Sequence, residues 1–118
     1  MILVDTSIWV GHLRSLVPEL TALIKADQVV MHPFIIGELA AGGLPRRAQT
    51  LDDLHAFSTI AVASHSDVLA MVEFHRLYGI GLSWIDLHLL AAARIARVQL
   101  WTADTRLAAA AKSSGIAY

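Results

Sequence analysis

The sequence predicts an α/β fold: a three-layer sandwich in which a central, mostly parallel sheet of four to five short strands has helices on both faces. Short apolar runs alternate with longer segments of helical periodicity along the whole chain. Strands separated by helices pair in parallel, and parallel sheets are covered on both faces, so their strands are apolar throughout. The composition agrees, because 56% of the 118 residues are hydrophobic and only 16% are charged.

Prolines, glycines and one acid mark the elements in the first half of the chain. Asp5 ends the first apolar run. Pro18 and Pro33 suit the first turn of a helix, where the missing N–H would have no partner in any case. The pair Gly42-Gly43 ends the helix that Pro33 begins. The expected elements are strands at 2–4, 29–32 and 59–63, and helices at 7–14, 18–26, 33–41 and 45–57.

Capping signals mark the elements in the second half. Ser64 and Asp67 have the spacing of a capping box, which predicts a helix start. A strongly apolar helix follows from Ser83, and a short apolar run then ends near Thr102. The expected elements are helices at 64–78, 83–97 and 105–113, a loop at 79–83, a strand at 98–102 and a strand stub at 116–118.

Length and composition exclude several classes of protein. A chain of 118 residues suits one domain, and we expect a single domain over residues 1–118. The longest stretch without Asp, Glu, Lys or Arg, 54–66, is shorter than the roughly 20 apolar residues that a membrane span needs. The N-terminus lacks the basic region of a signal peptide, and the chain has no cysteine. These features suit a cytoplasmic protein that does not enter the membrane.

Four carboxylates stand where an α/β protein binds its ligand. Asp5 directly follows the first strand, and Asp104 follows the fourth. The carboxyl ends of parallel strands form the ligand-binding edge of such sheets. Asp86 lies in the first turn of the helix that leads into the fourth strand, and Glu38 lies on an apolar helix, where we expect it to be buried.

Each aspartate also has a purely structural interpretation. Asp5 and Asp104 could cap the helices that follow them, and Asp86 could form a capping box with Ser83. As a group, however, the carboxylates predict a site for a hard divalent cation, because oxygen ligands without cysteine suit Mg²⁺ or Mn²⁺. Without an ion the carboxylates would repel one another, and with one they could activate water for attack on a phosphodiester.

The chain resembles the PIN-domain ribonucleases and, within them, the VapC-type toxins of toxin–antitoxin pairs. The resemblance covers essentially the whole chain, and the order and spacing of its segments make it specific. Its segments are Leu3-Val4-Asp5-Thr6-Ser7, Gly37-Glu38-Leu39, Leu82-Ser83-Trp84-Ile85-Asp86-Leu87-His88-Leu89-Leu90-Ala91-Ala92-Ala93 and Leu100-Trp101-Thr102-Ala103-Asp104.

The resemblance implies a function, a cofactor and partners. It implies a ribonuclease that hydrolyses RNA phosphodiesters by metal-activated water, leaving a 5′-phosphate and a 3′-hydroxyl. The implied partners are RNA, a VapB-type antitoxin whose C-terminal segment lies in the active-site groove, and a second copy of the chain in a homodimer or a larger toxin–antitoxin assembly. The implied catalytic and Mg²⁺- or Mn²⁺-binding residues are Asp5, Glu38, Asp86 and Asp104, with Ser7 and Thr102 as hydroxyls that orient ligands or water.

The net charge of −1 does not exclude RNA. Without the four candidate ligands, nine basic residues face six acidic ones, a balance of +3. Phosphate attraction would then depend on the metal and on a few arginines. Most of these arginines also suit a solvated helix face; they are Arg14, Arg46, Arg47, Arg94 and Arg97.

Other residues allow alternative interpretations. The six histidines lack the spacing of a zinc site, so we expect no histidine metal site. Trp9, Trp84 and Trp101 could stack on bases, but we expect them to fill the core or a dimer surface. One apolar set suits either the core or contact with an antitoxin or second copy; it comprises Ile8, Trp9, Leu13, Leu16 and Leu20.

Two other functions compete with the nuclease. A catalytically idle PIN-like module could bind RNA or protein, although such a copy would be expected to lose carboxylates that this chain keeps. A small phosphatase or phosphoacceptor domain also places an aspartate after its first strand. Such domains need a second aspartate two residues later or a lysine near the last strand, whereas this chain has Ser7 and only Lys112 in its final helix. The sequence therefore favours the nuclease.

Overall fold

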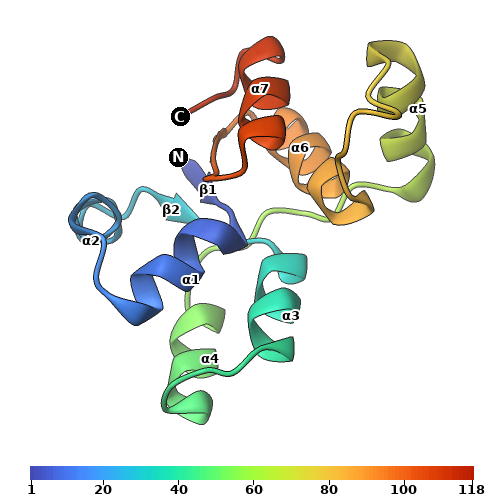
Figure 1. The fold of residues 1–118 in the computed structure, drawn as a ribbon. Helices are drawn as coiled ribbons and strands as arrows, with labels where there is room; N and C mark the ends of the chain where they lie inside the picture. The colour runs from blue at the N-terminus through green and yellow to red at the C-terminus, as the bar shows by residue number, and fades with distance from the viewer.

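The computed structural model describes residues 1–118 and has a parallel three-stranded sheet at its centre (Figure 1). Its strands are β1 (Ile2–Val4), β2 (Val29–Val30) and β3 (Gln99–Trp101), in the order β2-β1-β3. Leu3 lies opposite Val30 on one side and Leu100 on the other. The strand that begins the chain is therefore the central one, and its carboxyl end lies between two neighbours.

Seven helices surround this sheet. They are α1 (Thr6–Arg14), α2 (Pro18–Lys25), α3 (Pro33–Ala41), α4 (Arg47–His55), α5 (His65–His75), α6 (Trp84–Ala96) and α7 (Thr105–Ser113). In Figure 1, α6 and α7 lie on one side of β1, and α1 and α2 on the other. α5 packs on α6 at the far end of an elongated molecule of 41 × 25 × 23 Å. No helix is long and apolar enough to cross a membrane.

The main core forms between the sheet and the helices. Leu3 and Leu100 from the strands and Leu89 and Leu90 from α6 belong to one buried apolar cluster. The apolar set near the N-terminus is mostly part of this core: Trp9 and Leu20 are buried, Ile8 and Leu13 pack against the cluster, and Leu16 alone is largely exposed.

The predicted fold class and all seven predicted helices are confirmed, but the number of strands is wrong. The runs at 59–63 and 116–118 form only single parallel bridges, Met31 with Thr59 and Leu100 with Ala117. Each run lies at an edge of the sheet and has one neighbour, so few backbone hydrogen bonds hold it extended. These bridges extend each edge of the sheet by one pairing. The two expected strands therefore lie beside the sheet as predicted, but they are shorter than predicted.

Candidate active site

Asp5 is buried at the carboxyl end of the central strand. Its backbone N–H donates to the carbonyl oxygen of Trp101 at 2.8 Å, which continues the pairing of β1 with β3. Its Oδ1 accepts a 2.8 Å hydrogen bond from the backbone N–H of Thr6, so the side chain caps α1. Asp5 therefore acts as a helix cap, as its structural interpretation predicts, but capping uses only Oδ1 and does not account for Oδ2.

Two hydroxyls hold the second oxygen of Asp5. Ser7 Oγ donates to Oδ2 at 2.9 Å and Thr102 Oγ1 donates to it at 2.7 Å. Ser7 Oγ in turn accepts from the N–H of Ala103, and Thr102 Oγ1 accepts from the N–H of Asp104, both at 3.0 Å. The ends of β1 and β3 are thus joined by a network of side-chain hydroxyls around one buried carboxylate.

Asp104 caps α7 from the end of the neighbouring strand. Its Oδ1 accepts 2.9 Å hydrogen bonds from the backbone N–H groups of Arg106 and Leu107. The residue is exposed, and its backbone is tied to Asp5 through the hydroxyl of Thr102. Asp104 therefore both caps α7 and is linked to Asp5 through Thr102.

Glu38 lies beside this network, but the expectation that it is buried is wrong. Ile35 and Leu39 lie four residues apart on α3, so both face the core. Glu38 is on a different face of the helix and points to the surface. Its Oε1 accepts a 2.7 Å hydrogen bond from Thr6 Oγ1. Thr6 thereby links Glu38 to the residue that follows Asp5, a role that sequence reasoning missed although a hydroxyl next to Asp5 was visible.

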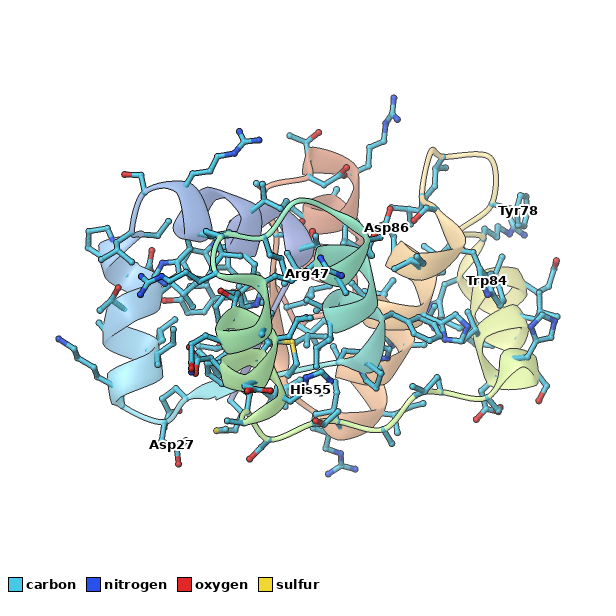
Figure 2. The ribbon with its side chains drawn as sticks, turned by 90° about the horizontal axis from the view of Figure 1, so that it is seen from below. Asp27, Arg47, His55, Tyr78, Trp84 and Asp86 are labelled. Atoms are coloured by element: carbon cyan, nitrogen blue, oxygen red, sulfur yellow. The ribbon has the colours of Figure 1, made fainter.

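Asp86 stands apart from the other three carboxylates in its hydrogen bonding. It forms a capping box with Ser83: the Ser83 N–H donates to Asp86 Oδ2, and the Asp86 N–H donates to Ser83 Oγ, both at 3.0 Å. Figure 2 shows it at the N-terminal end of α6. The preceding Ile85 lines a hollow of about 330 Å³ together with Glu38 and Phe34, so this end of α6 faces the surface that carries Glu38.

The side chains as they lie do not form a closed metal site. No three aspartate, glutamate or histidine side chains converge closely enough to hold an ion. The donor set nevertheless consists of oxygen atoms, and three of its four carboxylates are connected through Thr6 and Thr102. Because Glu38 and Asp104 are exposed, their side chains can turn without disturbing the core. The residues therefore fit a hard divalent ion.

The model of the PIN domain family matches residues 2–113, nearly the whole chain. The chain belongs to the PIN-domain family. Its type within that family follows from similarity to curated proteins. Ribonuclease VapC32 of Mycobacterium tuberculosis, from strains CDC 1551 / Oshkosh and ATCC 25618 / H37Rv, is 42% identical over 118 residues, which cover 99% of this chain and 95% of the relative. The PIN domain is of the VapC type.

Solved structures agree with the fold of this PIN domain. A toxin–antitoxin complex from Klebsiella pneumoniae contains a chain with a TM-score of 0.65 and 23% identity, covering 89% of this chain and 88% of that one. PAE2754 from Pyrobaculum aerophilum gives a TM-score of 0.63 at 20% identity, covering 92% of this chain and 82% of that one. At these identities the likeness establishes the fold of the PIN domain.

A second hollow of the PIN domain adjoins Glu38 on its other side. It has a volume of about 250 Å³ and lies between α1 and the link from α3 to α4. Its walls are mainly apolar, with one cation from Arg14 and one anion from Glu38. Arg47 braces the link, because its guanidinium donates to the carbonyl oxygens of Ala40 and Gly42 at 2.6 and 3.2 Å; Figure 2 shows it between α3 and α4.

A chain of ring contacts in the PIN domain joins the start of α3 to the start of α6. His32, Phe34, His88 and Trp84 contact one another in that order, each with ring centroids 4.9 Å from the next. Burial, and then the charge of His88, lowers the pKa of His32 to about 4. Burial, and then the charge of His65, lowers the pKa of His88. Trp84 packs against the ring of His88 but is 38% exposed, so it does not fill the core, and its place at a dimer surface stays a prediction.

Proposed function

We propose that this PIN domain is a Mg²⁺- or Mn²⁺-dependent endoribonuclease and the toxin of a VapBC-type pair. The observation that carries the proposal is the buried carboxylate of Asp5, which Ser7 and Thr102 hold at the end of the central strand. Carboxylates at this edge of a parallel sheet suit a metal-dependent hydrolase, and hydroxyl donors fix the orientation of such ligands. The similarity to a ribonuclease over nearly the full chain supports the same function.

The metal ligands in this proposal are Asp5, Glu38, Asp86 and Asp104. A bound divalent ion would lower the pKa of water and neutralise charge on the phosphodiester. The protein contributes orientation: Ser7 and Thr102 hold Asp5, Thr6 holds Glu38, and Ser83 holds Asp86 through its backbone N–H. Hydrogen bonds of this kind orient metal ligands and raise their affinity for the ion.

We place the antitoxin in the hollow between α1 and the α3–α4 link. Val10, Leu13 and Leu44 supply apolar walls for an extended segment, and Arg14 supplies a cation for an acidic side chain. Glu38 lies at the same hollow. A segment bound there would cover one of the proposed metal ligands, which explains how a VapB-type C-terminal segment would silence the nuclease in the cytoplasm.

We place a second copy of the chain against the end of the molecule formed by α5 and α6. Large apolar side chains are exposed there, most of all Phe74 at 83% and Ile95 at 63%. Tyr78 and Leu69 extend the same exposed set. A homodimer that covers these side chains removes apolar surface from water, which is the main driving force of association.

The alternative function is a catalytically idle module that binds RNA or protein. The experiment that separates the two is cleavage of total cellular RNA by the purified protein in Mg²⁺ or Mn²⁺, compared with EDTA. Asp5→Asn and Asp86→Asn keep the size of the side chain and remove its charge. Asp27→Asn is the matched control, because Asp27 lies far from Asp86 (Figure 2) and its backbone, with φ of 54°, is one that asparagine tolerates.

The nuclease predicts discrete fragments that disappear with EDTA and with both site substitutions and persist in the control. Fragments that form without metal, or equally in the Asp5→Asn and Asp86→Asn variants, would contradict the mechanism. Metal binding by the wild type without any cleavage would leave the binding module as the better description.

A further inference from the structure

A cationic hollow lies between α5, the link from α5 to α6, and α7. Its volume is about 360 Å³. Arg76, Arg106 and His75 line it, together with Ser113 and apolar side chains, and no carboxylate lines it. In a protein with a net charge of −1, such a concentration of basic groups attracts anions locally.

Arg106 places its charge between this hollow and the proposed metal ligands. Its backbone N–H donates to Asp104, so the residue begins α7 directly beside that carboxylate. Its guanidinium lies against Gly81, where a Cβ would come within 2.6 Å of Nη1. Gly81, with φ of +87°, precedes the Ser83–Asp86 capping box by two residues. The missing side chain at position 81 therefore lets the cation lie over the loop that leads to Asp86.

Arg76 is held in a backbone conformation that favours glycine. It ends α5 with φ of 54°, in the left-handed region, where a side chain is strained. Arg46 and Arg97 adopt the same left-handed conformation, so the strain by itself does not single out Arg76. What distinguishes Arg76 is that it lines the hollow together with Arg106.

We infer that this hollow binds the phosphates of the RNA strand next to the scissile bond, with Arg76 and Arg106 as its principal contacts. The inference rests on the proposed nuclease function and names the surface over which the substrate leaves the metal site. Guanidinium groups match phosphate geometry and stay charged, and they need no base sequence. The occupant is the backbone of RNA, because an exposed cationic hollow beside a phosphodiesterase site complements a chain of phosphates.

The test measures binding of a fluorescein-labelled single-stranded RNA of mixed sequence by anisotropy, in EDTA so that the RNA stays intact. Affinity is recorded over a range of salt concentrations for the wild type, Arg76→Gly, Arg106→Gln and the double variant. For a single strand, each lost phosphate contact reduces the magnitude of the negative slope of log K, the binding constant, against log salt by about 0.7. We expect the double variant to lose about 1.4 from this slope.

Arg97→Gly is the matched control. Arg97 ends α6 with φ of 56°, the same strained conformation, and it lies at the opposite end of that helix from Asp86, about 17 Å away. Its substitution removes the same charge and the same strain and is expected to leave the slope unchanged. Because both glycine variants relieve strain, thermal unfolding should show that neither is less stable than the wild type.

Two further outcomes separate this inference from the proposed function. In Mg²⁺, the double variant should cleave RNA with a raised KM and an unchanged kcat. If the wild type cleaves RNA and the double substitution alters neither the salt slope nor KM, the RNA-binding role of the hollow is refuted and the nuclease function stands. If the double variant loses slope while the wild type does not cleave RNA, the nuclease is refuted and the hollow stands. Unaltered RNA binding with lost binding of an acidic antitoxin peptide would reassign the hollow to protein and overturn the inference.

Discussion

Thr102 Oγ1 donates a 2.7 Å hydrogen bond to Oδ2 of Asp5, which lies 97 positions away in the sequence. The same hydroxyl accepts the backbone N–H of Asp104 at 3.0 Å. One threonine therefore joins the ends of β1 and β3 and sets the distance between two of the proposed metal ligands. The parallel pairing of the two strands makes this possible, because Val4 lies opposite Trp101, immediately before Asp5 and Thr102.

Replacing Thr102 with valine keeps the shape of the side chain and removes both hydrogen bonds. We expect cleavage to fall by about 10- to 100-fold, because hydrogen bonds that orient metal ligands have effects of that size. Unfolding by urea should show a loss of about 2 kcal/mol, typical of a hydrogen bond to a charged group. Thr102→Ser, which keeps the hydroxyl, should retain most activity. Equal cleavage by the valine variant and the wild type would refute this role.

Thr6 positions Glu38 in the same way from the start of α1. Thr6→Val removes the donor to Glu38 but keeps the backbone N–H that donates to Asp5. Because this bond is exposed, we expect a stability loss of no more than about 1 kcal/mol. The Mg²⁺ concentration for half-maximal cleavage should rise about tenfold, with activity recovered at high Mg²⁺. A lower maximum rate with unchanged Mg²⁺ dependence would mean that Thr6 does not act through the metal.

His32 makes the stability of the fold depend on pH. It is fully buried, its Nδ1 accepts the N–H of Phe34, and its Nε2 has no partner. Its pKa is about 4 in the folded protein, against 6.5 ordinarily, so the unfolded chain takes up the proton first as pH falls. The neutral ring therefore contributes full stability above pH 6.5, and this contribution is lost progressively toward pH 4. Between pH 7 and pH 5 we expect a loss of about 2 kcal/mol.

The measurement is denaturant unfolding at both pH values, compared with His32→Asn. Asparagine can still cap α3 but does not titrate, so the variant should lose less stability on acidification than the wild type. Identical pH dependence in the two proteins would show that other groups cause the effect.

Arg47 stabilises the link that forms one wall of the proposed antitoxin hollow. Arg47→Met removes its bonds to the carbonyl oxygens of Ala40 and Gly42 while keeping most of the apolar stem. We expect a stability loss of about 1 kcal/mol and weaker binding of the antitoxin, measured by calorimetry. Arg46→Gly is a suitable control, since it removes a neighbouring charge from a left-handed position with φ of 43°. Unchanged antitoxin affinity in Arg47→Met would place the antitoxin elsewhere.

Patterns local in the sequence predicted most of the fold. Pro18, Pro33 and the capping serines at 64 and 83 act on their own turns, so the helices that they begin form where expected. The helix expected from Pro45 begins at Arg47 instead, because Arg46 is left-handed. The strands expected at 59–63 and 116–118 are too long, since each run pairs with the sheet by a single bridge, and the number of pairings depends on how the whole chain packs.

The sequence by itself determined the chemistry that is available to this protein. It supplies three aspartates and two hydroxyls at the starts of helices and the ends of strands, together with Glu38 on a helix, and it carries the resemblance to PIN domains. Only the tertiary structure decided how these groups are connected. Thr6 contacts Glu38, and Arg106 lies against Gly81; each contact joins elements far apart in the chain. The packing of α3 likewise leaves Glu38 at the surface. Such contacts depend on packing and strand register, which local spacing does not encode.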